Sequence, residues 1–193
     1  MEKSRKWQTV QDGKLLYLPD FIAKEEADAL HSLLLHRTAW QQKSISLFGK
    51  TIPQPRLIAW YGERNYQYSG LTLEAQPMPQ EIITIKQRCE QVCQSQFNSV
   101  LLNLYRNGQD SMGWHQDNEP ELGINPVIAS LSLGARRMFA LKHTQSGETI
   151  RLELSHGALL VMGGALQHYW KHALPKTKRP KEPRINLTFR TIK

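Results

Sequence analysis

The sequence predicts a mostly β fold, a double-stranded β-helix or jelly roll, with helices packed outside one of its two sheets. Short strand-like runs separated by turn residues fill the chain after residue 99, and two amphipathic helical segments precede them. The length of 193 residues suits one hydrophobic core and is short for two. An immunoglobulin-like sandwich is the alternative, but the helical N-terminal part fits it poorly. We expect one integrated domain, with an N-terminal extension over 1–98 and the jelly-roll core over 99–193.

The first half of the chain predicts two helices and a hairpin. Apolar residues recur at helical spacing over 23–36 and again over 80–96. Cys89 and Cys93 lie on the apolar face of the second segment, so we expect them to line a buried surface rather than to form a disulfide. Between the helices, residues 40–62 are rich in strand formers and predict an extended hairpin.

Eight short strands are predicted in the second half. They cover 100–105, 112–115, 127–133, 138–143, 149–154, 158–162, 167–173 and 184–191. The last strand alternates completely, with polar side chains on one face and Ile185, Leu187 and Phe189 on the other. An arginine is poorly tolerated inside a barrel unless an anionic group faces it, so this polar face predicts a ligand site. An edge strand with a solvated polar side is the alternative.

Composition excludes several classes of protein. Hydrophobic residues make up 40% and charged residues 22%, a balance unlike that of disordered or collagen-like chains. No apolar run approaches the roughly 18 residues that span a bilayer, and the charged first six residues do not resemble a signal peptide. We therefore expect a soluble monomer without membrane contacts, cytoplasmic if bacterial and nuclear if eukaryotic.

The net charge of +8 is concentrated at one end of the chain. Between Lys171 and Lys193, eight basic residues stand against a single acid, Glu182. This basic tract predicts a polyanionic partner, most often a nucleic acid, and a solvated lysine surface is the alternative.

A candidate metal site begins at His115 and Asp117. The two residues are separated by one position at the end of a predicted strand, so their side chains project on the same face. A third ligand is available downstream at His172, with His168 as a competitor. Two histidines and one carboxylate on one face of iron are typical of non-haem Fe(II) oxygenases. A surface His-Asp pair without a metal is the alternative.

Taken together, these motifs resemble the AlkB family of Fe(II)- and 2-oxoglutarate-dependent nucleic-acid dealkylases. The matching motifs are Asn103-Leu104-Tyr105, His115-x-Asp117, His172 and Arg184-x-Asn186-Leu187-x-Phe189-Arg190. The resemblance extends from about residue 15 to the end of the chain. Segments 47–50 and 66–72 are similar to the branch of the family that repairs alkylated duplex DNA.

The resemblance implies a complete set of iron and cosubstrate ligands. His115, Asp117 and His172 would bind Fe(II), and His172 is favoured over His168 because the family's histidine precedes a small residue, Leu-Pro and a basic segment. 2-Oxoglutarate would be held by Asn103, Tyr105, Arg184, Asn186, Thr188 and Arg190. Among these, Arg184 would pair with its distal carboxylate and Arg190 with the carboxylate nearer the metal, while O2 would be the second cosubstrate.

The same resemblance implies oxidative demethylation of 1-methyladenine and 3-methylcytosine in single- or double-stranded DNA, with release of formaldehyde, succinate and CO2. A methylated base must leave the stack to reach the metal. The residues that would contact the substrate are Phe48, Gly49, Lys50, Arg56, Tyr66, Gln67, Tyr68, Asn118 and Glu119. RNA demethylation, a non-catalytic nucleic-acid-binding module and a small-molecule or protein hydroxylase are the alternatives.

Phe48 is the most informative of these residues, because it stands beside Gly49 at the predicted turn of the hairpin. An exposed apolar side chain there would enter the base stack and fill the gap left by a flipped nucleotide. Packing of Phe48 back onto the hairpin is the alternative. Lys50, Arg56 and the basic C-terminal tract would contact phosphates, which supply affinity without reading sequence.

Two tyrosines and two polar residues would contact the flipped base itself. Tyr68 would stack on the base opposite His115, while Tyr66, Asn118 and Glu119 would contact its edge or the neighbouring backbone. Packing of both tyrosines within a strand is the alternative.

Overall fold

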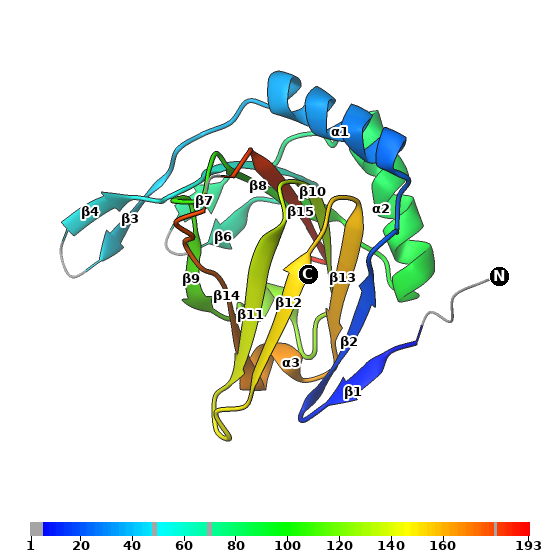
Figure 1. Cartoon of the computed structure of the whole chain (residues 1–193), viewed down its shortest axis with the longest axis vertical. Coiled ribbons are helices and arrows are strands. Elements are labelled where there is room, and N and C mark those ends of the chain that lie inside the picture. Colours follow the sequence, from blue (N-terminus) through cyan, green and yellow to red (C-terminus); the bar gives the residue numbers. More distant parts are fainter. Residues whose placement is uncertain (1–5, 48–49, 69–70, 180) are drawn as a thin grey trace.

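The computed structural model describes residues 6–47, 50–68, 71–179 and 181–193, which form two facing β-sheets with two long helices outside the larger sheet (Figure 1). Neighbouring strands in both sheets are antiparallel. This arrangement confirms the mostly β jelly-roll class.

Strands from both halves of the chain build the larger sheet, in the order β1-β2-β13-β10-β15-β8-β5. They are β1 (Gln8–Val10), β2 (Gly13–Leu18), β5 (Leu57–Gly62), β8 (Ser99–Tyr105), β10 (Ile128–Gly134), β13 (Ala158–Gly163) and β15 (Arg184–Arg190). Because β1, β2 and β5 precede residue 99, the sheet crosses the boundary between the predicted extension and the predicted core.

The smaller sheet has the order β12-β11-β14-β9. Its strands are β9 (Met112–His115), β11 (Arg137–His143), β12 (Thr149–Leu154) and β14 (Trp170–Leu174). The eight strands β8 to β15 correspond to the eight predicted in the second half of the chain. One of those predictions is wrong at its start, because residues Leu166–Tyr169 form the short helix α3 before β14. There the chain turns from the larger sheet to the smaller one and buries Leu166 and Gln167.

Two small hairpins lie apart from the main sheets. β3 (Ser44–Leu47) pairs with β4 (Lys50–Pro53), and β6 (Tyr66–Tyr68) pairs with β7 (Leu71–Leu73). The first hairpin projects from the body of the protein in Figure 1. The hairpin predicted over residues 40–62 is therefore found only as far as β4. The following strand, β5, pairs with β8 in the larger sheet instead.

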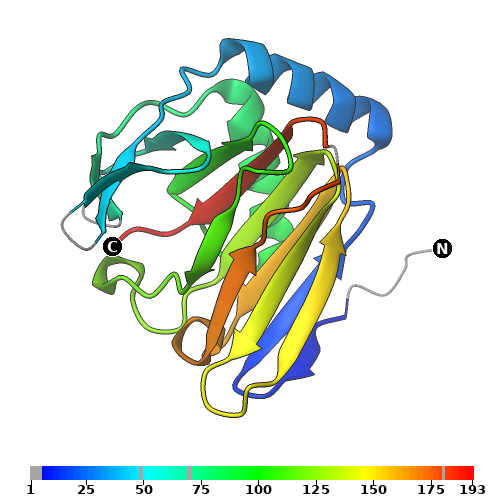
Figure 2. The ribbon, with the colours of Figure 1, turned by 60° about the vertical axis from the view of Figure 1, so that its left-hand side comes forward.

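The long helices α1 (Lys24–Arg37) and α2 (Gln80–Cys93) cover the larger sheet on the side away from the smaller one (Figures 1 and 2). A short 3-10 helix, η1 (Pro120–Leu122), follows β9. The helix α2 ends earlier than predicted because Gln94 adopts a left-handed conformation, with φ of 52°. Its two cysteines, Cys89 and Cys93, are buried free thiols, as predicted.

Alternation along β15 divides its side chains between two environments. Ile185, Leu187 and Phe189 pack beneath α1 and α2 in the largest hydrophobic cluster. The intervening polar residues therefore face the smaller sheet, where a second cluster that includes Phe139 and Trp170 fills part of the space between the sheets. The fold thus turns a row of polar side chains toward the interior.

Among the described residues, no helix is both long enough and apolar enough to cross a membrane.

Candidate metal and cosubstrate site

One cavity between the two sheets is lined by all nine residues that were predicted to bind iron or 2-oxoglutarate. They come from β8, β9 and the residues after it, β14 and β15, and they are Asn103, Tyr105, His115, Asp117, His172, Arg184, Asn186, Thr188 and Arg190. The cavity has no contribution from His168, whose Nε2 instead lies 3.4 Å from the backbone N–H of Asn125. The geometry therefore favours His172 over His168 as the third ligand.

The three candidate metal ligands meet at the edge of the smaller sheet. His115 on β9 and His172 on β14 are register partners, with ring centroids 4.1 Å apart, and Asp117 follows β9. One ligand atom from each residue lies within 4.8 Å of the other two. The Oδ1 atom of Asp117 is buried and accepts no hydrogen bond from the described residues. This oxygen is therefore available to a cation.

The electrostatic surroundings hold the three side chains in their ligand forms. Burial alone would raise the pKa of Asp117, but the positive charge of Arg190 and the nearby imidazoles outweigh it and lower that pKa to about 2. Burial, reinforced by His115, lowers the pKa of His172 to about 3. Burial also lowers the pKa of His115 below its ordinary value. At neutral pH the site therefore consists of one carboxylate and two neutral imidazoles, the forms that bind metals.

Arg190 has a contact that the sequence did not indicate. Its Nη2 donates to Asp117 Oδ2 at 2.9 Å, and both side chains are almost completely buried. The arginine thus occupies Oδ2, which lies 4.0 Å from His172 Nε2, and leaves Oδ1 at 3.7 Å from His115 Nε2. The predicted contact of Arg190 with the cosubstrate carboxylate nearer the metal would place that group beside the same ion pair.

Arg184 lies at the other end of β15, away from the histidines. Its Nη2 donates to Ser132 Oγ at 2.9 Å, and its guanidinium carbon stands 5.3 Å from the centre of the Tyr105 ring. Burial lowers the pKa of Arg184 to about 10, so the group stays charged at neutral pH. Its Nε is buried without a hydrogen-bond partner in the described part of the chain. A buried cation with an unused donor suits a carboxylate ligand.

The polar side chains between the two arginines, Asn186 and Thr188, are hydrogen-bonded to each other and to β10. Asn186 Nδ2 donates to Ser130 Oγ at 2.7 Å and to Leu131 O at 3.1 Å, and Thr188 Oγ1 donates to Asn186 Oδ1 at 2.8 Å. These bonds fix the side chains of β15 against β10. Ser130 lines the cavity as well, although nothing in its local sequence distinguishes it from other strand serines.

Arg56 is placed differently from the prediction. Only 3% of its surface is exposed, and its Nε donates to Asn103 Oδ1 at 2.8 Å. The prediction of a surface phosphate contact is therefore wrong. The reason is tertiary: the segment between β4 and β5 runs along the larger sheet, where β5 pairs with β8 and brings Arg56 beside Asn103.

Tyr66 is also more buried than expected for a contact with a base. It is 1% exposed and stacks on Trp60, with ring centroids 4.9 Å apart. Burial raises its pKa well above the ordinary value of a tyrosine. The guanidinium carbon of Arg190 lies 5.7 Å from the centre of its ring. Tyr66 thus supports the wall of the site from a hydrophobic cluster, and the predicted edge contact with a base does not fit this placement.

The remaining predicted substrate contacts lie in three settings. Asn118 is exposed, and Glu119 is half-buried with a pKa raised by burial. The backbones of Lys50, Gln67 and Tyr68 belong to the small hairpins, and their predicted side-chain roles stay predictions. Phe48 and Gly49 lie outside the described residues.

The basic tract is divided by the fold. Arg184 and Arg190 are buried in the cavity wall, whereas Lys171, Lys176 and Lys178 are exposed. The interior arginines therefore cannot contribute to a surface for a polyanion.

Two buried polar residues that sequence reasoning missed hold the site together. Gln167 Oε1 accepts the backbone N–H of Asp117 at 2.9 Å, and this ties the helix α3 to the metal ligand. Arg137 donates to the backbone carbonyls of Asn107, Asp110 and Pro175 at 2.8 to 3.0 Å, and its guanidinium carbon lies 5.8 Å from the centre of the Tyr105 ring. Neither residue could be found from strand periodicity, because their partners come from distant segments.

Comparisons with known proteins agree with this geometry. A family model described as the 2OG-Fe(II) oxygenase superfamily matches residues 14–190. The human alpha-ketoglutarate-dependent dioxygenase alkB homolog 3 is 44% identical over 190 residues, which cover 93% of this chain and 66% of the relative. The mouse DNA oxidative demethylase ALKBH2 is 40% identical over 204 residues, which cover 98% of this chain and 85% of the relative. The chain thus spans slightly less than two thirds of the alkB homolog 3 relative.

A solved structure, that of OsALKBH1, superposes with a TM-score of 0.66 at 16% identity and covers 96% of this chain and all of that one. At this identity the likeness concerns the fold.

Proposed function

The chain belongs to the 2OG-Fe(II) oxygenase superfamily, and from this premise we propose that it oxidatively removes alkyl groups from nucleic-acid bases. The observation that carries the proposal is the single cavity that combines a two-histidine, one-carboxylate cluster with a buried arginine at its far end. At the finer level, the proposed reaction is demethylation of 1-methyladenine and 3-methylcytosine in DNA, with release of formaldehyde, succinate and CO2.

The donor set fits Fe(II). Two neutral imidazoles and one carboxylate, from His115, His172 and Asp117, are the ligand types of non-haem Fe(II) oxygenases. The buried Asp117 Oδ1, which accepts no hydrogen bond from the described residues, supports this fit. With both imidazoles neutral at physiological pH, no proton has to leave before the metal binds.

The far end of the cavity fits 2-oxoglutarate. Arg184 offers a buried guanidinium with an unused Nε donor, and Tyr105 stands beside it. Asn186 and Thr188 lie along the same strand between Arg184 and the metal ligands. A dicarboxylate with one end at Arg184 and the other near the metal ligands would satisfy these groups together.

Once bound, iron with O2 and 2-oxoglutarate supplies the oxidising power, and the cosubstrate leaves as succinate and CO2. The protein's own residues bind, orient and exclude water. Arg190 holds Asp117 through Oδ2, and Gln167 holds its backbone, so the carboxylate keeps one orientation. Leu101, Phe139 and Leu174 line the cavity with apolar surface, which limits the access of water.

A nucleic-acid substrate is supported by the names of the ALKBH2 relatives and by the surroundings of the cavity. The relatives in the comparisons include proteins named DNA oxidative demethylases. The half-buried Glu119 and the exposed Asn118 follow the ligand Asp117 directly and supply hydrogen-bonding groups beside the site. A base read by these groups has to be turned out of its stack, because the metal ligands lie between two sheets.

The decisive experiment combines the protein with Fe(II) and 2-oxoglutarate without oxygen, adds a methylated oligonucleotide and admits O2. Mass spectrometry then follows the oligonucleotide and succinate. We expect loss of the methyl group from DNA with one succinate formed per methyl removed, and no loss with the Asp117→Ala variant. Matched DNA and RNA strands carrying the same lesion decide the nucleic acid, and faster turnover of the RNA would replace DNA with RNA in the proposal. Succinate formation without any loss of methyl from either strand would overturn the proposed dealkylation.

A further inference from the structure

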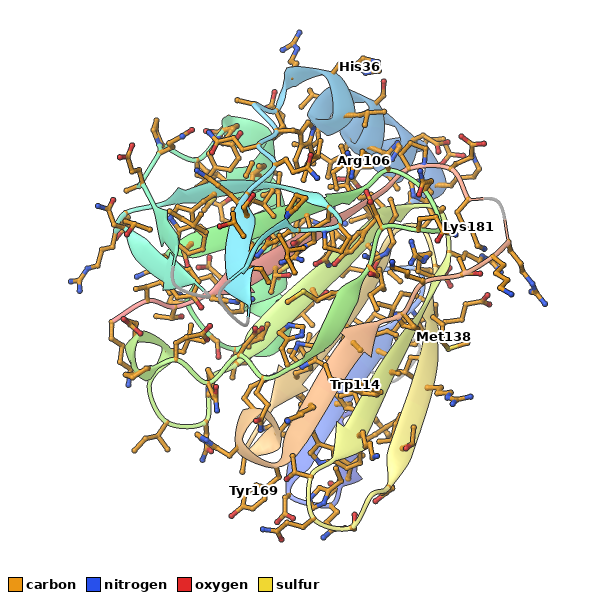
Figure 3. All side chains as sticks on the ribbon, turned by 90° about the vertical axis from the view of Figure 1, so that its left-hand side faces the viewer. His36, Arg106, Trp114, Met138, Tyr169 and Lys181 are labelled. Carbon is orange, nitrogen blue, oxygen red and sulfur yellow. The ribbon has the colours of Figure 1, made fainter. Side chains whose placement is uncertain are left out.

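The outer face of the smaller sheet carries an exposed tryptophan beside two lysines. Trp114 on β9 is 51% exposed, and it lines a shallow depression together with Lys142 on β11 and Lys171 on β14. Both lysines are exposed. Figure 3 views this side of the molecule and shows Trp114 over the smaller sheet, with Met138 on the same side.

Trp114 is the direct neighbour of a candidate iron ligand but points the opposite way. Successive side chains of a strand alternate between the two faces of a sheet, so His115 turns toward the cavity and Trp114 turns outward. Because β9 is an edge strand, only the width of one strand separates the two faces at this point. A polymer with one unit in the cavity can therefore pass over the edge of β9 and reach the indole.

The charges around the indole favour an anionic partner. Lys142 and Lys171 are register partners on adjacent strands, and like charges placed opposite each other are destabilising. Among the described residues, neither lysine forms an ion pair with a carboxylate. A chain of phosphates along this face would offset that repulsion.

We propose that Trp114, Lys142 and Lys171 form a second contact for the polynucleotide, outside the cavity, in which an unpaired base stacks on the indole and its phosphates meet the two ammonium groups. The inference rests on the proposed nucleic-acid substrate. It adds a location for the part of the strand that flanks the target base. The base has to be unpaired, because bases within a duplex are covered on both faces by their neighbours. Stacking on an aromatic side chain tolerates any base and adds affinity without sequence preference.

Substrates of two lengths distinguish the outer contact from the reaction in the cavity. Single-stranded methylated oligonucleotides of about three and about 15 nucleotides are compared, because only the longer strand can occupy both the cavity and the outer face. We expect Trp114→Ala to weaken binding of the longer strand and to lower its kcat/KM by about tenfold, while both values for the shorter strand stay unchanged. Trp114→Phe, which keeps an aromatic face, should restore most of the loss. Met138→Ala is the matched control, since it removes another exposed apolar side chain from the same sheet.

Salt dependence and fluorescence test the two parts of the contact separately. Lys142→Gln and Lys171→Gln should each reduce the slope of log Kd against log salt concentration by about 0.7 for the longer strand, and Trp114→Ala should leave the slope unchanged. The longer unmethylated strand should quench tryptophan emission of the parent protein, and Trp114→Phe should remove most of that quenching.

The outcomes distinguish failure of this contact from failure of the proposed function. Turnover of the shorter strand tests the proposed function alone. Equal losses for both lengths with Trp114→Ala would mean that Trp114 acts through His115, and this would overturn the outer contact. Unchanged binding of the longer strand would also overturn it and would leave the exposed indole for a partner of another class.

Discussion

The cavity between the sheets and residues 50–68 beside it both contain side chains predicted to contact ligands, yet the two regions differ in how their side chains are placed. In the cavity, the polar residues of β15 all face the same enclosed space as the metal ligands. In the second region, Arg56 and Tyr66 are buried against Asn103 and Trp60, and neither presents an exposed face to a nucleic acid.

The difference lies in what constrains each region. A strand that alternates between polar and apolar residues has one orientation in which its apolar side chains are buried, so its polar row is located as soon as the sheet forms. Arg56 follows a small hairpin and has no such periodicity. Its environment depends on which strand pairs with β5, a long-range contact that no local pattern encodes.

The largest expected effect comes from the metal ligands. His115→Ala, Asp117→Ala or His172→Ala should each abolish turnover, because an incomplete set of ligands does not hold iron in a reactive geometry. Titration of the apoprotein with Fe(II) under anaerobic conditions should show weakened binding, and circular dichroism should show an unchanged fold. His168→Ala is the control and should retain activity. Loss with His168→Ala and retention with His172→Ala would overturn the ligand assignment.

Removing the arginine at the far end of the cavity should have the next largest effect. Arg184→Ala deletes a charge-assisted pair worth about 1.5 to 3 kcal/mol, so the 2-oxoglutarate concentration for half-maximal rate should rise by about 10- to 150-fold. The rate at saturating cosubstrate should change much less. Lys176→Ala removes an exposed positive charge instead and serves as the control. An unchanged requirement for 2-oxoglutarate would place its distal carboxylate elsewhere.

Arg56 sharpens the contrast between the two regions. Arg56→Ala should lower the free energy of unfolding by about 1 to 3 kcal/mol, since it leaves a buried amide oxygen of Asn103 without its donor. Lys50→Ala should leave stability within about 0.5 kcal/mol and weaken nucleic-acid binding. Urea unfolding and oligonucleotide binding measured on both variants test the pair. If Arg56→Ala instead weakened nucleic-acid binding and left the free energy of unfolding unchanged, Arg56 would again be the candidate phosphate contact.

Phe48 tests whether the hairpin β3–β4 acts on duplex substrates. Phe48→Ala should lower activity on methylated duplex DNA several-fold and leave the matched single strand nearly unchanged, because only a duplex leaves a gap when a base is turned out. Equal losses on the two substrates would favour packing of Phe48 within the hairpin.

The last expected effect is on stability and not on turnover: the free energy of unfolding of the metal-free protein should depend on pH. The pKa of His172 is about 3 in the folded chain and about 6.5 when unfolded, so the unfolded chain binds the proton more tightly between these values. The contribution of His172 to the free energy of unfolding is therefore constant above pH 6.5 and falls as the pH decreases toward 3. For one such group, the slope is at most about 1.4 kcal/mol per pH unit. His172→Gln should reduce the slope of the free energy of unfolding against pH, measured by urea unfolding. Identical slopes for the parent protein and the variant would contradict the lowered pKa of His172.

The sequence by itself predicted the class of fold and the eight strands of the second half from local spacing, and the resemblance to the AlkB family added the nine residues that line the cavity. Local spacing accounts for the face on which several of these residues lie. A period of two places Arg184, Asn186, Thr188 and Arg190 on one face, and the separation of His115 and Asp117 by one position places both on the same side of a strand.

Only the tertiary structure decided how those residues combine. The register of β9 with β14 brings His172 rather than His168 beside His115, and the fold pairs Arg190 with Asp117 across 73 positions of sequence. It also draws Arg56 into the interior, supports Asp117 from Gln167 and leaves Trp114 facing outward. Each of these outcomes depends on contacts between segments far apart in the chain, where burial and hydrogen bonding select one register among many and local periodicity carries no information about the partner.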